Sequence, residues 1–257
     1  MAAILQLLLV PANASTAKTK TQQCCPATAT ALYPRAPLSI VYRMLDIYGN
    51  FGTPCKCIEI DAKSGAYRVP GAISVERSRS IAAAVSEAEQ AGLITDRGAG
   101  LTTKDIEVKA LPGWVQELCA LAVGNVIRLA EPYYKSVPSA ASDFPLSMED
   151  FTSQAFVIVY DAAGREDTQS SLRKHKDGHD GLTVLITLTQ SGTDFTGGGT
   201  RFFTMDGIVD ARPDTGGGVF FAADGTEYRG AKHAGLDISS GRRLVLAYFL
   251  DTDSFHI

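Results

Sequence analysis

Between residues 154 and 251 the chain consists of short apolar, β-branched segments separated by glycine-rich turns, and this pattern constrains its fold most. The pattern is clearest in the segments 155–160, 182–188, 218–222 and 243–249. Glycines stand between them at positions 197–199 and 216–218. Many short strands with glycine turns are typical of a sandwich or barrel. We therefore predict a mainly β core over residues 154–251, in the form of a jelly roll with helices packed outside it.

Two helices are predicted before this core, in a support segment over residues 73–135. Ser74 can cap a helix that ends near Gly92. A second helix is predicted from Pro112, because proline suits a first turn, where its missing N–H is not needed. Residues 57–61 alternate like a strand. The apolar stripe of the second helix is expected to pack in the core, and consists of Trp114, Val115, Leu118, Leu121, Ala122, Val126 and Leu129.

Residues 1–45 differ in composition from the rest and are predicted to be a targeting segment or a disordered tail. They contain no acidic residue, since the first is Asp46, and they are rich in alanine, threonine and serine. This composition resembles an organelle transit peptide. An apolar run at 4–10 followed by Ala12-Asn13-Ala14 instead resembles a secretory signal. Organelle, secretory pathway and cytoplasm therefore all remain open, and the domain itself is predicted over 46–257.

Composition and charge narrow the function classes. Of the 257 residues, 45% are hydrophobic and 20% are charged, which is ordinary for a globular protein with a core. A net charge of -4 gives the whole chain no nucleic-acid footprint, and no apolar run reaches the roughly 18 residues that span a bilayer. The five cysteines lack the spacing of a zinc site, and Cys119 is expected to be a buried core residue.

A candidate metal site is formed by His175, Asp177 and His233. Positions two apart on a strand point to the same face, so His175 and Asp177 can reach one ion. His233 follows on a different predicted strand. Two histidines and one carboxylate are the facial ligand set of non-haem iron(II) oxygenases, and they leave coordination positions open. The same ligand types also fit Mn(II) or Co(II).

The chain has two further histidines, His179 and His256, that are alternative candidates for a metal ligand. His179 lies in the turn-like stretch 178–181 beside Asp180, so we predict a solvent-exposed turn residue. His256 stands two residues from a polar C-terminus and is predicted to be uninvolved. His175 is therefore preferred over His179 as the metal ligand.

Arg243 lies ten positions past His233, at the start of an apolar strand. A cation that enters the buried face of a sheet needs a partner. That partner is either an internal carboxylate or the carboxylate of a ligand, which a guanidinium can grip with two hydrogen bonds. Arg242 points to the opposite face and is expected to be exposed.

A series of segments in order resembles the Fe(II)/2-oxoglutarate dioxygenase superfamily, and more closely its prolyl 4-hydroxylase-like branch. The matching residues lie between 156 and 250, at 159–161, 172–177, 183–188, 195–202, 232–235 and 241–246. The segment 195–202 resembles the family's F-x-G-G-x-T-x-F motif. Residues 1–70 are not covered by the resemblance.

This resemblance implies a double-stranded β-helix with iron inside one mouth. His175, Asp177 and His233 would be the iron ligands, and Arg243 would pair with the far carboxylate of 2-oxoglutarate. Ascorbate would keep the iron reduced. Thr187 falls where the family often places a hydroxyl that helps to hold that carboxylate.

Further positions near the co-substrate follow from the same resemblance. Thr183 and Leu185 share the strand parity of Thr187, so they are expected to line the same pocket. Tyr160 lies where some members use a tyrosine near the co-substrate, and core packing is an equal alternative. The glycines at 197–199 are expected to form a tight sheet corner rather than to contact the ligand.

Three function hypotheses follow. The first is hydroxylation of a peptidyl proline, or of a lysine, with O2 and 2-oxoglutarate. The second is the same chemistry on a small molecule or nucleobase. The third is a non-catalytic jelly-roll binding module. Two departures from relatives bear on the substrate, namely Thr189 in place of a frequent asparagine and a polar stretch at 161–171, which is expected to be a loop over the active-site mouth.

Overall fold

The computed structural model describes residues 57–97, 103–133, 147–163, 169–179, 181–223 and 230–251. The predictions for residues 1–45 and for His256 lie outside the described residues, as do residues 164–168 of the expected loop over the mouth. Within the described part, no helix is long and apolar enough to cross a membrane.

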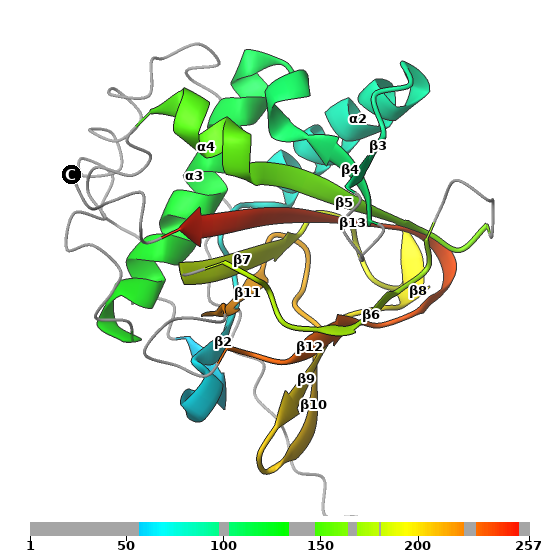
Figure 1. Cartoon of the computed structure of the whole chain (residues 1–257). Helices are drawn as coiled ribbons and strands as arrows, with labels where there is room; N and C mark the ends of the chain where they lie inside the picture. Colours follow the sequence, from blue (N-terminus) through cyan, green and yellow to red (C-terminus); the bar gives the residue numbers. More distant parts are fainter. Residues whose placement is uncertain are drawn as a thin grey trace, which may run out of the picture.

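Two antiparallel sheets form most of the molecule, which confirms the mainly β prediction (Figure 1). The major sheet runs in the order β1 (Ile58–Asp61), β2 (Ala66–Val69), β11 (Gly218–Ala222), β7 (Gly181–Thr187), β13 (Ile238–Asp251), β5 (Ala155–Asp161), β4 (Thr103–Glu107) and β3 (Thr95–Arg97). A short strand, β8 (Phe195–Gly197), pairs with the start of β13. The minor sheet runs in the order β10 (Gly207–Ala211), β9 (Thr200–Thr204), β12 (His233–Gly235) and β6 (Leu172–His175). The strand predictions that began at residue 155 agree with β5.

Three α-helices pack on the outer face of the major sheet: α2 (Val75–Gln90), α3 (Gly113–Ala130) and α4 (Met148–Gln154). Short 3₁₀ turns occupy Ala62–Ser64, Val108–Ala110 and Glu131–Tyr133. As predicted, Ser74 caps α2, because its hydroxyl accepts a hydrogen bond from the N–H of Arg77 at 3.3 Å. Pro112 stands at the N-cap of α3, one residue before the predicted first turn. The helix α4 was not predicted.

The stripe of α3 faces the core, with one exception. Val115, Ala122 and Val126 are fully buried against the major sheet, but the side chain of Trp114 is 48% exposed. The prediction that Trp114 packs in the core is wrong. Trp114 lies in the first turn of the helix, on the flank that it shares with the half-buried Leu118, and the end of the helix leaves it uncovered.

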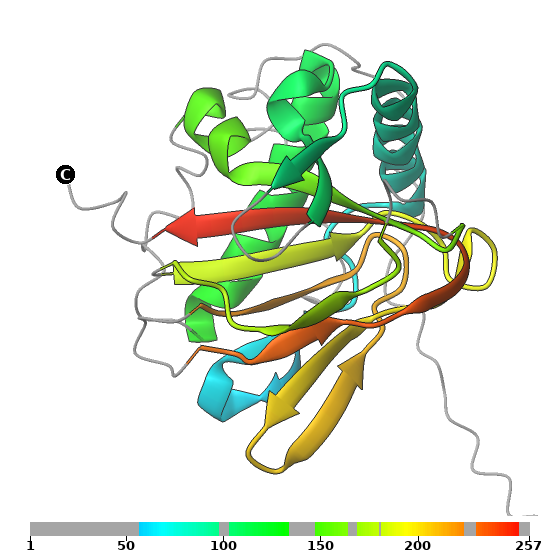
Figure 2. The same cartoon turned by 45° about the vertical axis from the view of Figure 1, so that its right-hand side comes forward.

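Strand parity divides the major sheet into a helix-covered face and an inner face. On β13, Leu244 and Leu246 join the core under the helices, whereas Val245 and Ala247 belong to a separate apolar cluster on the inner face. The minor sheet lies below the major sheet, and its β9–β10 hairpin extends away from the body (Figure 2). Side chains on the inner face of the major sheet therefore meet those of the minor sheet.

Candidate metal centre

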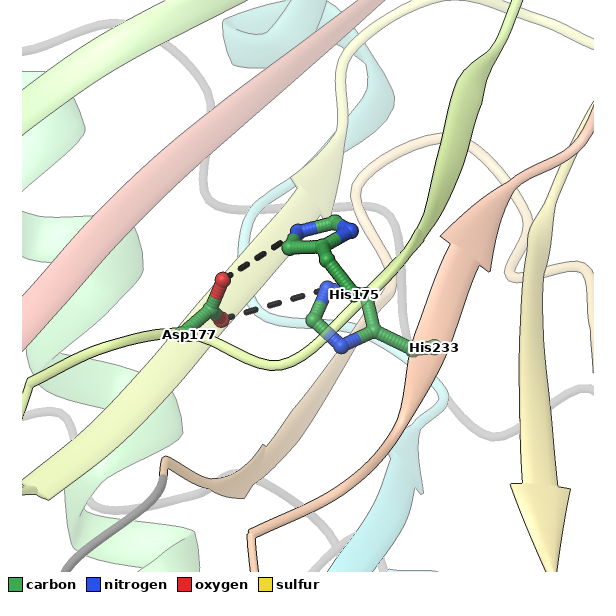
Figure 3. A group of neighbouring side chains, drawn as sticks. All are labelled: His175, Asp177 and His233. Atoms are coloured by element: carbon green, nitrogen blue, oxygen red, sulfur yellow. Dashed lines mark ion pairs between the residues drawn. The ribbon is translucent and has the colours of Figure 1, made fainter. Parts of the chain in front are cut away.

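Neighbouring strands of the minor sheet bring the two predicted histidine ligands together. His175 ends β6 and His233 begins β12, and the two residues are register partners with ring centroids 4.2 Å apart. Asp177 lies two residues beyond the end of β6, so the prediction that it shares a strand with His175 is wrong. The chain after β6 nevertheless turns its carboxylate toward both imidazoles (Figure 3). Ligand atoms from all three residues lie within 4.8 Å of one another.

The orientation of both imidazoles fits a metal ion. His175 Nε2 is 3.3 Å from Asp177 Oδ1, and His233 Nε2 is 3.9 Å from Asp177 Oδ2. The Nδ1 atoms face backbone carbonyl oxygens, that of Arg173 at 2.8 Å and that of Ala231 at 2.9 Å. When Nδ1–H donates to a carbonyl, the lone pair of Nε2 is left for a metal. The donor set of two imidazoles and one carboxylate therefore suits Fe(II).

The Asp177 carboxylate is held in its ionised form. Burial alone would raise its pKa, but the hydrogen bond from His175, the nearby His233 and a hydrogen bond from Thr183 lower the pKa to about 2. The Thr183 hydroxyl donates to Asp177 Oδ2 at 2.6 Å. Burial lowers the pKa of His233. Burial also acts to lower the pKa of His175, but its hydrogen bonds to Asp177 and to the Arg173 carbonyl raise it overall.

The rival histidine lies outside this cluster but is not exposed. His179 occupies a bend after Asp177, is half-buried, and stacks on the ring of Phe249 with centroids 4.6 Å apart. The prediction of a solvent-exposed turn residue is therefore wrong on exposure. The physical reason is that the segment after β6 folds back against the end of β13, whose Phe249 covers the imidazole.

A cavity of about 470 Å³ opens beside the three ligands, between the two sheets. Its walls come from the inner face of the major sheet and from the facing part of the minor sheet. The lining residues are Phe156, Ile158, Tyr160, Leu172, His175, Lys176, Asp177, Gly178, Thr183, Leu185, Thr200, His233, Gly235, Arg243, Val245, Ala247 and Phe249. Its volume falls within the range of small-molecule sites.

Arg243 lines this cavity and is only 3% exposed. Its Nη1 donates to the carbonyl of Gly199 at 3.3 Å, and its Cζ lies 5.2 Å from the centroid of the Tyr160 ring. No carboxylate of a described residue lies within ion-pair distance of it, and burial lowers the pKa of its guanidinium. Among the described residues, the internal carboxylate that was one of its two expected partners is therefore not found, and the Gly199 carbonyl and the Tyr160 ring are its neighbours.

The neighbouring Arg242 has a different environment from the one predicted. It is half-buried rather than exposed, and it forms ion pairs with Glu89 of α2 and, at 3.8 Å, with Asp161. The side chain points to the helix-covered face, as strand parity requires, but α2 lies over that position. Arg242 therefore connects β13 to α2.

The glycines between β8 and β9 form the predicted sheet corner, with φ values of +81°, +67° and +117° for Gly197, Gly198 and Gly199. They also make a contact that was not predicted. A Cβ on Gly198 would lie 3.0 Å from Cδ of Arg243. The corner thus leaves room for the Arg243 side chain and supplies a carbonyl to it.

The other predicted co-substrate residues fall on or near the cavity wall. Tyr160, Thr183 and Leu185 line it, whereas Thr187 shares their inner face but is buried outside the lining. Burial raises the pKa of the Tyr160 phenol, although Arg243 acts to lower it. Thr200 also lines the cavity and was not singled out from the sequence. The sequence feature that could have identified Thr200 is its place as the threonine of the F-x-G-G-x-T-x-F motif.

Comparison with known proteins gives a short sequence match. No protein-family model matches the chain. The multifunctional procollagen lysine hydroxylase and glycosyltransferase LH3 of Homo sapiens is 33% identical over 96 residues, which are 37% of this chain and 12% of that protein. Its counterpart in Rattus norvegicus is 34% identical over 96 residues. The chain thus matches only a small part of the length of these curated relatives.

Solved structures show the fold over most of the chain. The non-haem α-ketoglutarate-dependent epimerase SnoN from nogalamycin biosynthesis superposes with a TM-score of 0.50 at 14% identity, over 74% of this chain and 78% of that one. A prolyl hydroxylase from Trichoplax adhaerens gives a TM-score of 0.50 at 13% identity, over 86% and 96%. The fold is therefore that of the 2-oxoglutarate-dependent oxygenases. The two imidazoles and one carboxylate of the cluster match in donor type the facial ligand set of non-haem iron(II) oxygenases.

Proposed function

We propose that the protein is an Fe(II)- and 2-oxoglutarate-dependent dioxygenase that hydroxylates a peptidyl prolyl or lysyl residue, with release of succinate and CO2. One observation carries the proposal. The ligand cluster of His175, Asp177 and His233 faces a cavity whose wall also contains the buried cation of Arg243. A metal cluster alone would serve several chemistries, whereas a buried guanidinium in the same cavity calls for an anionic co-substrate.

The residues of the chain take distinct roles in this proposal. Arg243 binds the far carboxylate of 2-oxoglutarate, with the hydroxyls of Tyr160 and Thr200 on the same cavity wall. Thr183 fixes the Asp177 carboxylate, and the apolar lining excludes water. When bound, iron and 2-oxoglutarate supply the oxidative decarboxylation and the removal of hydrogen from a substrate C–H. Ascorbate as the reductant that maintains Fe(II) is part of the proposal.

A peptide substrate is favoured by the relatives. The curated matches are named lysine hydroxylases, and the Trichoplax adhaerens structure is a prolyl hydroxylase in complex with a peptide fragment. The SnoN epimerase belongs to nogalamycin biosynthesis, so a small-molecule substrate is the second candidate. The two facing antiparallel sheets support the expected double-stranded β-helix. A non-catalytic binding module needs neither the ligand cluster nor Arg243.

Succinate release tests the proposal. We expect the wild-type protein with Fe(II), 2-oxoglutarate, ascorbate and air to release succinate slowly, and faster with a proline-rich peptide. His175→Ala should abolish release, because it removes one of three metal ligands, while far-UV circular dichroism remains that of the wild type. His179→Ala is the matched control and should retain release, since His179 lies outside the cluster. Full activity in His175→Ala would refute the site, and no release by the wild type would favour the binding module.

A further inference from the structure

We propose that the end of the cavity away from Arg243 is an apolar substrate subsite that admits an uncharged side chain, such as the prolyl ring, and discriminates against a lysyl ammonium. This inference rests on the proposed function and chooses between the two peptide substrates that it names. It follows from the layout of the cavity along β13, from the position of the metal ligands and from the charges of the lining.

The cavity follows the inner face of β13 from a cationic end to an apolar end. Arg243, Val245, Ala247 and Phe249 alternate along the strand, and all four line the cavity. Six residues of strand span about 20 Å. Only the first of these four side chains is polar, so the two ends of the cavity differ in the ligand group that they can accept.

The metal ligands lie toward the apolar end. Thr183, which donates its hydrogen bond to Asp177, is the register partner of Phe249. Arg243 is instead the register partner of Tyr160, three inward positions away along β13. A diacid held by Arg243 therefore extends toward the metal from one side. The C–H that reacts must approach from the other side, where Phe249 lies.

Aromatic and small side chains shape this second side. Ala247 is paired with Phe156 on β5 and with Leu185 on β7. The rings of Phe156 and Phe249 meet edge to face with centroids 5.2 Å apart. Ala247 is the smallest residue in the inward row of β13, and it forms the buried wall of the cavity beside Phe156. The subsite is therefore suited to a compact apolar group.

The charges of the lining oppose an ammonium ion. Among the described residues that line the cavity, Asp177 is the only acid, and it is engaged by His175, His233 and Thr183. The lining also contains the cation Lys176. A buried ammonium without a carboxylate partner loses its hydration and gains no ion pair, whereas a prolyl ring carries no charge. Since the curated relatives are named lysine hydroxylases, charge selection is where we expect this chain to differ.

Two small probes that differ in charge test the inference. Pentan-1-ol and pentylammonium have the same chain length and can be titrated by calorimetry into the full protein loaded with Mn(II) and 2-oxoglutarate, in which no turnover occurs. We expect pentan-1-ol to bind at least about tenfold more tightly. Tighter or equal binding of pentylammonium would overturn the inference. A failure of both probes to bind would also overturn it.

A variant pair locates the binding. Ala247→Leu fills the subsite and should weaken pentan-1-ol by at least about tenfold. Ala91→Leu makes the same change at an exposed position after α2 and should bind as the wild type does. Wild-type affinity in a folded Ala247→Leu would overturn the assignment of the subsite. A calorimetric titration of the protein with 2-oxoglutarate alone separates the two proposals. If 2-oxoglutarate does not bind, the proposed function is wrong; if it binds and the probes behave otherwise than expected, only the subsite is wrong.

Discussion

At the scale of single residues, the metal centre depends on a side chain that is not itself a ligand. Thr183 donates a 2.6 Å hydrogen bond to Asp177 Oδ2 and is 1% exposed, so the carboxylate has a fixed orientation before metal binds. We expect Thr183→Val, which keeps the shape and removes the donor, to weaken Mn(II) binding by about 10–100-fold. A calorimetric titration of the apo-protein with Mn(II) measures this.

Matched variants separate the hydrogen bond from a loss of packing. Thr183→Ser retains the donor and should recover most of the affinity. Thr196→Val is the matched control, because the exposed Thr196 hydroxyl is hydrogen-bonded to Ser239 and Ser240 and not to a metal ligand. This variant should bind Mn(II) as the wild type does. Wild-type affinity in Thr183→Val would show that Asp177 is oriented without this hydroxyl.

The chemical type of a residue can be read from the sequence, whereas its burial depends on which other element packs over it. The cluster of His175, Asp177 and His233 was predictable, because two histidines and one carboxylate are a known set of metal ligands. The exposure of Trp114 and His179 was predicted wrongly, because it depends on which element happens to lie over each side chain. The periodicity of apolar residues within one segment carries no information about which distant element buries a side chain.

At the scale of elements, β13 is the strand on which the site depends. It pairs with β8 at its start, then with β5 and β7, and Gly241 lies between the two parts with φ +73°. A Cβ on Gly241 would lie 2.0 Å from the carbonyl oxygen of Asp194. Only a glycine can occupy this position without displacing backbone, so the direction in which β13 presents Arg243 depends on it.

Gly241→Ala should therefore destabilise the protein through both strain and a clash. We expect Gly192→Ala, at φ +81° with no atom within 4 Å of the new Cβ, to lose about 1–2 kcal/mol from strain alone. Gly241→Ala should lose at least about 2 kcal/mol more, because backbone must move. The free energies of unfolding in urea measure both. Equal losses in the two variants would show that the contact with Asp194 relaxes at no cost.

Elements with a clear apolar pattern in the sequence were predictable, and elements without one were not. The apolar strands β5, β7, β11 and β13 each appear in the sequence as a β-branched or aromatic run. The helix α4 has only seven residues, too few to repeat a helical period, and β10 has exposed apolar residues that give no alternation. Their places are set by the chain on either side, through tertiary packing.

At the scale of the whole molecule, the core under the helices joins α2 and α3 to six strands of the major sheet (β2, β4, β5, β7, β11 and β13) in one cluster. This cluster contains Cys119, which is fully buried in the middle of α3. Burial raises the pKa of its thiol, and a thiolate is the reactive form. Cys119 is therefore a reporter of the opening of the whole core rather than of a local fluctuation.

We expect Cys119 to react with iodoacetamide only through global unfolding. A stability of about 5 kcal/mol would slow its alkylation about a thousandfold or more relative to the protein in urea. Cys57, which is 8% exposed and directly precedes the edge strand β1 of the major sheet, should react faster through local opening. Peptide mapping by mass spectrometry distinguishes the sites. If native Cys119 were alkylated as fast as in urea, the helices would not form one cooperative unit with the sheet that carries the metal centre.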